Sequence, residues 1–87
     1  MCDEEAGEVP RDNVIHVLNA WKVGVSPDPH NPGAYLVAQG TVVESLPLPE
    51  CVSRKMLQYL KRKFGIYIHH FYHPDMAIQT PPTSKPN

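Results

Sequence analysis

The chain has 87 residues and a formal net charge of −1, which is enough length for one small domain with a modest hydrophobic core. Its acidic start, MCDEEAGEVPRDN, is unlike a secretion signal, and no apolar run approaches the length that spans a bilayer. We therefore expect a cytoplasmic or nuclear protein with no membrane segment.

Residues 1–12 form an acidic arm with a net charge of −4, because five carboxylates stand against one arginine. The arm shows no hydrophobic periodicity, so we expect it to be disordered. A single bridge between Cys2 and Cys51 is not how small secreted domains are held together, so we expect reduced cysteines and a reducing compartment. The arm could fold back over a basic surface of its own chain or pair head to tail with a second copy.

Residues 14–25 fit two structures. As a helix, the segment would follow a capping Asp12 or Asn13 and place Val14 and Leu18 on one stripe. As a strand, its many β-branched side chains would suit a pleated surface. We predict a strand.

Residues 26–49 predict a loop, then a strand, then the start of a helix. SPDPHNPG, residues 26–33, holds three prolines and should connect two strands as an irregular loop. A central strand is predicted over residues 34–46, with Gly40 in mid-strand as a bulge or close backbone approach. The sequence LPLP then imposes extended backbone, and Pro49 suits the first position of a helix.

The segment Glu50–Phe64 predicts an amphipathic helix. Its apolar residues recur every fourth position and should pack on the sheet, and Gly65 is placed to end the helix in the left-handed conformation. The opposite face is basic, with a net charge of +4 over residues 50–63. The cations of that face are Arg54, Lys55, Lys61 and Arg62.

Residues 66–72 alternate apolar, aromatic and histidine side chains, which predicts a last strand at a sheet edge. Residues 13–74 would then form one domain, followed by a disordered, proline-rich tail at residues 75–87. We expect an α+β fold of β-β-α-β order, with one basic helix packed on one face of a small sheet and with disordered termini.

The stretch from Gly40 to Ile68 combines a strand that ends in Leu-Pro, a helix that ends in LKRKFG, and a further strand. This order resembles the β–α–β core of small translation-initiation domains over about a third of the chain. The resemblance implies a translation-associated role. The chain lacks the glycine-rich, basic loop that such domains carry before the first strand, so no functional residue is transferred.

The candidate site is an interaction surface. Aromatic residues dominate the energetic centres of interfaces, and an edge strand can extend the sheet of a partner or of a second copy. We therefore expect a non-enzymatic adaptor or complex subunit that binds another protein, or itself as a homodimer, without a cofactor. The expected partner-binding residues are Tyr67, His69, Phe71, His73, Arg54, Lys55, Lys61 and Arg62.

Other uses of these residues stay open. The basic helix beside Tyr67 and Phe71 would suit single-stranded RNA or another polyanion, although a pI near 6.5 argues against a strong phosphate footprint. His69 and His73 could bind a metal ion, or the clustered histidines could weaken an interface in mild acid. Cys51 near a helix start could be a nucleophile, but no histidine or acid stands at a spacing that implies a catalytic pair. We predict no catalytic and no metal-binding residue.

Overall fold

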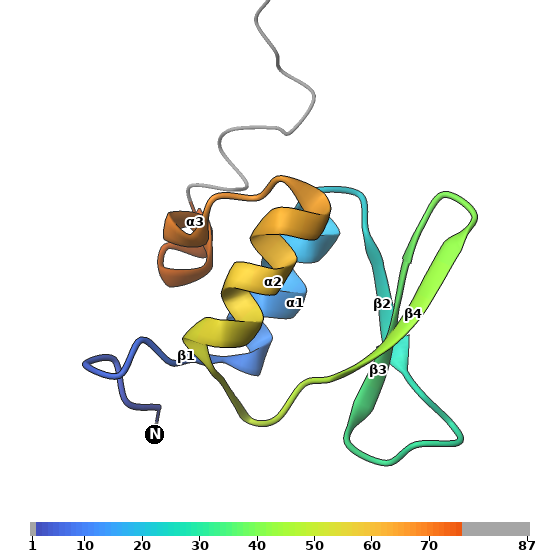
Figure 1. Ribbon diagram of the computed structural model, residues 1–87, viewed down its shortest axis with the longest axis horizontal. Helices are drawn as coiled ribbons and strands as arrows, with labels where there is room; N and C mark the ends of the chain where they lie inside the picture. The colour runs from blue at the N-terminus through green and yellow to red at the C-terminus, as the bar shows by residue number, and fades with distance from the viewer. Residues whose placement is uncertain (1, 76–87) are drawn as a thin grey trace, which may run out of the picture.

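The computed structural model describes residues 2–75. Its elements are β1 (Val9–Pro10), α1 (Arg11–Ala20), β2 (Gly24–Pro27), β3 (Ala34–Gln39), β4 (Val42–Pro47), β5 (Cys51–Val52), α2 (Arg54–Phe64) and α3 (Ile68–Tyr72). They form two small antiparallel sheets, β1–β5 and β2–β3–β4, and the helices gather on one side of the larger sheet (Figure 1). The α+β class is confirmed, but the order of elements differs from the expected β-β-α-β.

The first long segment is helix α1, so the strand predicted over residues 14–25 is wrong for most of its length. Val14, Val17 and Leu18 are fully buried, and they follow the helical spacing. Burial of this stripe outweighs the weak preference of β-branched residues for strands. The Asn13 side-chain amide also donates a hydrogen bond to the Phe71 carbonyl at 3.3 Å, which ties α1 to α3.

The segment predicted as one central strand is a hairpin of β3 and β4. Gln39 pairs with Val42, so Gly40 and Thr41 form a two-residue turn between the strands. Gly40 has a φ of 62°, and type II′ hairpin turns require a positive φ at this first turn position. The expected mid-strand bulge at Gly40 is therefore wrong. The irregular connection before the hairpin is confirmed, because residues 28–33 link the antiparallel strands β2 and β3.

Helix α2 begins four residues later than expected. Ser53 is its N-cap, and the Ser53 hydroxyl accepts a hydrogen bond from the Met56 amide at 3.3 Å. Pro49 is therefore not a helical residue, and Val52 lies in β5, where it pairs with Val9. The predicted end is confirmed, because Gly65 adopts the left-handed conformation after Phe64.

The last predicted strand, residues 66–72, is also wrong, because Ile68–Tyr72 forms the short helix α3. After Gly65 the chain turns back along the other helices (Figure 1). Ile66 and Phe71 are fully buried, and His70 is buried beside Trp21. The alternation of side chains favoured a strand, but the burial of this segment against helices leaves it with no sheet to join. The β–α–β order on which the translation-initiation resemblance depended is therefore absent.

The acidic arm is not disordered in its described part, residues 2–12. Its loop, residues 2–8, leads into β1, and α1 begins at Arg11. A disulfide joins Cys2 to Cys51, with Cα atoms 5.3 Å apart, so the expectation of two reduced cysteines is wrong. Disulfides are typical of extracellular and other oxidising compartments, which weighs against the expected cytoplasmic or nuclear location. The expected tail lies outside the described residues from residue 76 onward.

One hydrophobic core joins the helices to the sheet. No helix in residues 2–75 is long and apolar enough to cross a membrane. The buried apolar residues are Val9, Val14, Val17, Leu18, Val23, Val37, Leu46, Leu48, Val52, Leu57, Leu60, Ile66 and Phe71. Every helix and both sheets contribute to this set, so the core fixes the helices relative to one another and to β3 and β4.

Candidate functional site

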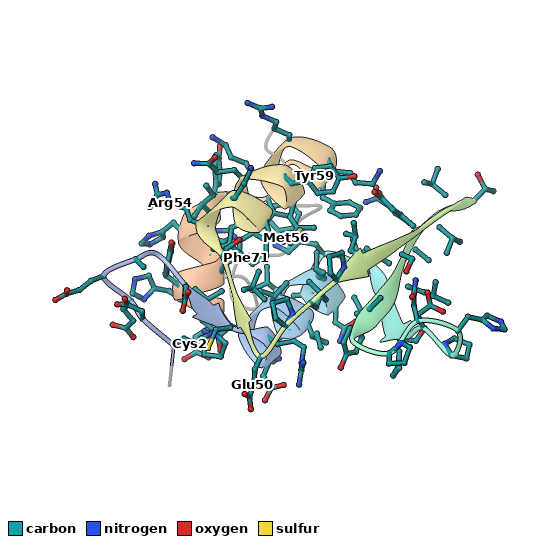
Figure 2. The ribbon with its side chains drawn as sticks, turned by 60° about the horizontal axis from the view of Figure 1, so that its bottom comes forward. Cys2, Glu50, Arg54, Met56, Tyr59 and Phe71 are labelled. Atoms are coloured by element: carbon teal, nitrogen blue, oxygen red, sulfur yellow. A yellow bond between two sulfur atoms is a disulfide. The ribbon has the colours of Figure 1, made fainter. Side chains whose placement is uncertain are left out.

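The candidate site is a basic groove on the outer side of α2. Leu57 and Leu60 are fully buried and hold α2 against the core. The opposite face of the helix therefore points to solvent, and the cations on it are exposed. Figure 2 shows Arg54 directed away from the body of the molecule, whereas Met56 lies toward it.

A hollow of about 330 Å³ runs along this face. It is lined by Arg54, Gln58, Lys61, Arg62 and Ile68, and we call it the α2 groove. The four α2 residues have the spacing i, i+4, i+7 and i+8, which places them on one side of a helix. Ile68, the first residue of α3, supplies an apolar contact at the other wall. The groove thus combines three cations with one amide and one hydrocarbon side chain.

The cations of the groove have no carboxylate partner. Among residues 2–75, the one ion pair joins Lys63 to Glu44, and neither residue lines the groove. Arg54, Lys61 and Arg62 also form no side-chain hydrogen bond with other residues of the described chain. Their charges are therefore free to bind an anionic group, and the guanidinium groups suit carboxylates in a two-bond geometry.

Of the eight residues that the sequence indicated, the structure brings three together in the α2 groove: Arg54, Lys61 and Arg62. Lys55 is exposed on the same helix but does not line the groove. Phe71 is fully buried in the core and is not available to a partner, so that prediction is wrong. Phe71 lies inside the molecule in Figure 2.

The remaining three predicted residues lie on or next to α3, not on an edge strand. Tyr67 is 67% exposed and immediately precedes Ile68 of the groove, with its ring packed edge-on against His70 at 5.9 Å between centroids. His69 and His73 are exposed, and their rings lie 4.6 Å apart. No group of three or more metal-ligating side chains occurs in residues 2–75, so these two imidazoles form a pair without a third ligand.

His70, unlike His69 and His73, is buried in the protein. Its ring lies 5.8 Å from that of Trp21, and its Nδ1 atom has no hydrogen-bond partner in the described chain. Burial lowers the pKa of His70 below its ordinary value of 6.5, and the nearby His69 lowers the pKa further. Burial therefore favours the neutral form of this side chain.

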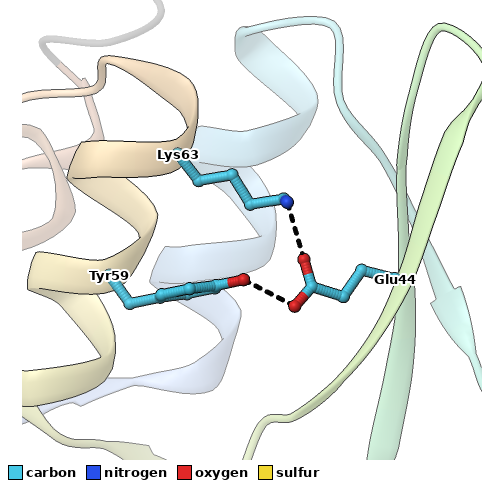
Figure 3. Close-up of polar contacts among 3 residues, drawn as sticks. All are labelled: Glu44, Tyr59 and Lys63. Atoms are coloured by element: carbon cyan, nitrogen blue, oxygen red, sulfur yellow. Dashed lines mark hydrogen bonds and ion pairs between the residues drawn. The ribbon is translucent and has the colours of Figure 1, made fainter.

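Sequence reasoning missed the contact that joins α2 to the sheet. The Glu44 carboxylate of β4 accepts a hydrogen bond from the Tyr59 hydroxyl at 2.5 Å and pairs with the Lys63 ammonium at 2.8 Å (Figure 3). We call this contact the Glu44 clasp. Its two partners lower the pKa of Glu44, Lys63 more than Tyr59, and Glu44 in turn raises the pKa of both. The clasp therefore removes Lys63 from the unpaired cations of α2.

A second hollow, of about 360 Å³, adjoins the disulfide and is lined by Cys2, Pro10, Arg11, Asp12, Glu50 and Cys51. Its one cation is already engaged, because Arg11 donates to the Leu48 carbonyl at 3.1 Å and lies over the Tyr35 ring. Cys51 is in the disulfide, so it is not a free nucleophile. This hollow therefore offers no comparable set of free charges.

Two residues of the α2 groove were absent from the sequence prediction. The helical spacing from Arg54 could have indicated Gln58, because it lies one turn further along the same face. Ile68 could not be indicated, because its place depends on the turn at Gly65 and on α3. Comparison with protein families, curated proteins and solved structures finds no match to this chain in any of the three.

Proposed function

We propose that this protein is a non-enzymatic interaction module that binds an acidic segment of a partner protein through the α2 groove. The observation that carries the proposal is the set of three exposed cations, Arg54, Lys61 and Arg62, which line one hollow and lack carboxylate partners among residues 2–75. Carboxylates of a partner would form ion pairs with these three cations.

The apolar residues near the groove favour a peptide over a simple anion. Ile68 forms part of the wall, and the exposed ring of Tyr67 precedes it in the chain. Tyrosine is enriched among the residues that dominate binding energy at interfaces. An acidic segment with an apolar side chain would therefore match the groove better than a polyanion without one.

The surroundings of the groove disfavour RNA. Bases of single-stranded RNA stack on aromatic rings, but no aromatic residue lines the groove, and Phe71 is buried. The chain as a whole has a formal net charge of −1, whereas nucleic-acid-binding domains are typically strongly basic. Binding of RNA remains an outcome that the experiment distinguishes.

The test measures fluorescence anisotropy of a short labelled peptide of glutamate and leucine against the full, oxidised chain. Lys61→Ala with Arg62→Ala should weaken binding about five- to tenfold, because two partly exposed ion pairs are lost. Lys55→Ala is the matched control, because Lys55 is an exposed cation of the same helix outside the groove. Its effect should stay within about twofold.

Two further probes decide between partners. A peptide of lysine and leucine should not bind, and a mixed single-stranded RNA should bind more weakly than the acidic peptide at near-physiological salt. If Lys55→Ala and Lys61→Ala with Arg62→Ala reduce the affinity for the acidic peptide equally, the groove is not the binding site. Tighter binding of RNA, with a steep salt dependence, would replace the peptide by a polyanion.

A further inference from the structure

The N-terminal loop, residues 2–8, lies against one end of the α2 groove. Gly7 is buried there with a φ of 85°, and a Cβ atom at this position would lie 3.1 Å from the Cβ of Arg54. The Tyr72 hydroxyl donates a hydrogen bond to the Gly7 carbonyl at 2.8 Å. The loop therefore passes close to the side chain of Arg54, which also lines the groove.

The loop is strongly acidic, and only some of its carboxylates form hydrogen bonds within the loop. The Asp3 carboxylate accepts hydrogen bonds from the amides of Glu5 and Ala6, and the Glu8 carboxylate accepts one from the Asp3 amide. Glu4 and Glu5 are exposed, and their carboxylates have no partner among residues 2–75. Two free carboxylates thus belong to a loop that passes close to Arg54, the first cation of the groove.

Both ends of the loop are fixed. The disulfide joins Cys2 to Cys51 of β5. After the loop, Val9 of β1 pairs with Val52, which also belongs to β5. Arg54 follows Val52 by two residues, so the attachment points lie beside the start of α2. A charged segment tethered in this way has a high effective concentration at the neighbouring site.

We propose that the N-terminal loop is an intramolecular competitor for the α2 groove and that the Cys2–Cys51 disulfide maintains this competition. The inference rests on the proposed function, because the loop competes with the acidic partner for the α2 groove. When the disulfide is intact, the carboxylates of Glu4 and Glu5 raise the negative potential at Arg54 and reduce its affinity for a second acidic segment.

Reduction releases one of the two attachments. A small dithiol transfers two electrons and two protons to the bridge, so the Cys2–Cys51 bond breaks, two cysteine thiols form, and the dithiol closes its own disulfide. The loop is then held through β1 alone. The carboxylates of the loop are then less confined to the start of α2, so they lower the affinity of the groove for an acidic partner less strongly.

The experiment compares the acidic-peptide affinity of the full chain before and after reduction with a dithiol, with the redox state confirmed by mass spectrometry. Reduction should raise the affinity about two- to fivefold. Cys2→Ser should reproduce the reduced affinity and no longer respond to the dithiol. Circular dichroism checks that each form is folded.

A second variant keeps the disulfide and removes the charge. Glu4→Gln with Glu5→Gln should raise the affinity of the oxidised chain by a similar factor and abolish most of the response to reduction. Asp12→Asn is the matched control, because Asp12 is an exposed acid of α1 outside the loop, and it should leave both affinities unchanged.

The outcomes separate this inference from the proposed function. If oxidised and reduced chains bind equally well, and Lys61→Ala with Arg62→Ala still weakens binding, then the loop is not a competitor but the groove remains the site. If the groove variant has no effect, the proposed function itself fails. An oxidised dimer in light scattering that Glu4→Gln with Glu5→Gln dissociates would place the loop in the groove of a second copy, which overturns the intramolecular version.

Discussion

The helical layer and the three-stranded sheet of this protein are held in place in different ways. Around the helices, fully buried residues such as Leu18, Leu57 and Phe71 form most of the core, and the disulfide secures the N-terminal loop. The sheet reaches the core through few fully or nearly fully buried side chains, chiefly Val37 and Leu46, and its polar link to α2 is the Glu44 clasp at the surface.

The far end of the hairpin shows the same contrast. Val42 and Val43 of β4 are 56% and 59% exposed, whereas Val14, Val17 and Leu18 of α1 are fully buried. Regions with few buried apolar contacts open more readily than the core. The helical layer therefore determines global stability, and the hairpin should open locally before it.

The largest expected effect tests the helical layer directly. Phe71→Ala removes a fully buried ring and should cost about 3–5 kcal/mol of unfolding free energy, a large part of the roughly 5–15 kcal/mol typical of a whole domain. Urea denaturation measures this loss. Tyr67→Ala is the control, because Tyr67 is 67% exposed, and it should change stability by no more than about 0.5 kcal/mol. Similar losses from both variants would contradict the burial of α3.

Reduction of the disulfide should have the next largest effect on global stability. The bridge joins residues separated by 49 positions, and the entropy of closing a loop of this length in the unfolded chain corresponds to about 4 kcal/mol. Denaturation with and without a dithiol measures the difference. Cys2→Ser should reproduce the reduced stability, and an unchanged midpoint would show that the bridge does not form in solution.

Mild acid should destabilise the helical layer through His70. Burial lowers the pKa of His70 below the ordinary value of 6.5, so the unfolded chain binds a proton more readily than the folded one. The contribution of neutral His70 is present above pH 6.5 and is lost as the pH falls below that value toward the lowered folded pKa. Thermal denaturation over this pH range should show a smaller decline in the melting temperature for His70→Leu than for the parent chain. His16→Gln, on the exposed face of α1, should leave the decline unchanged.

The smallest effect is expected at the sheet. Glu44→Gln removes the charge that pairs with Lys63, so amide hydrogen exchange in β3 and β4 should become faster while exchange in α1 stays the same. The pKa of Glu44 is lowered in the folded chain, so the clasp contributes above the ordinary value of 4.5 and is lost as the pH falls through the folded pKa. Glu50→Gln is the control, because Glu50 is exposed outside the clasp. Faster exchange in α1 as well would show that the sheet and helices open together.

The sequence alone determined those features that depend on local periodicity. The four-residue spacing of apolar side chains indicated α2, Gly65 indicated its end, and the cations on its opposite face indicated the basic surface that forms most of the α2 groove. These inferences hold because the signals lie within one or two helical turns, where backbone geometry fixes which side chains share a face.

The tertiary structure decided the rest. Residues 14–20 and 68–72 have patterns that fit a strand or a helix, and burial against other helices selected the helix in both. The bridge between Cys2 and Cys51 and the close approach of Gly7 to Arg54 bring together residues more than 40 positions apart. Such contacts depend on how the whole core packs, and no local pattern encodes which distant side chains will meet.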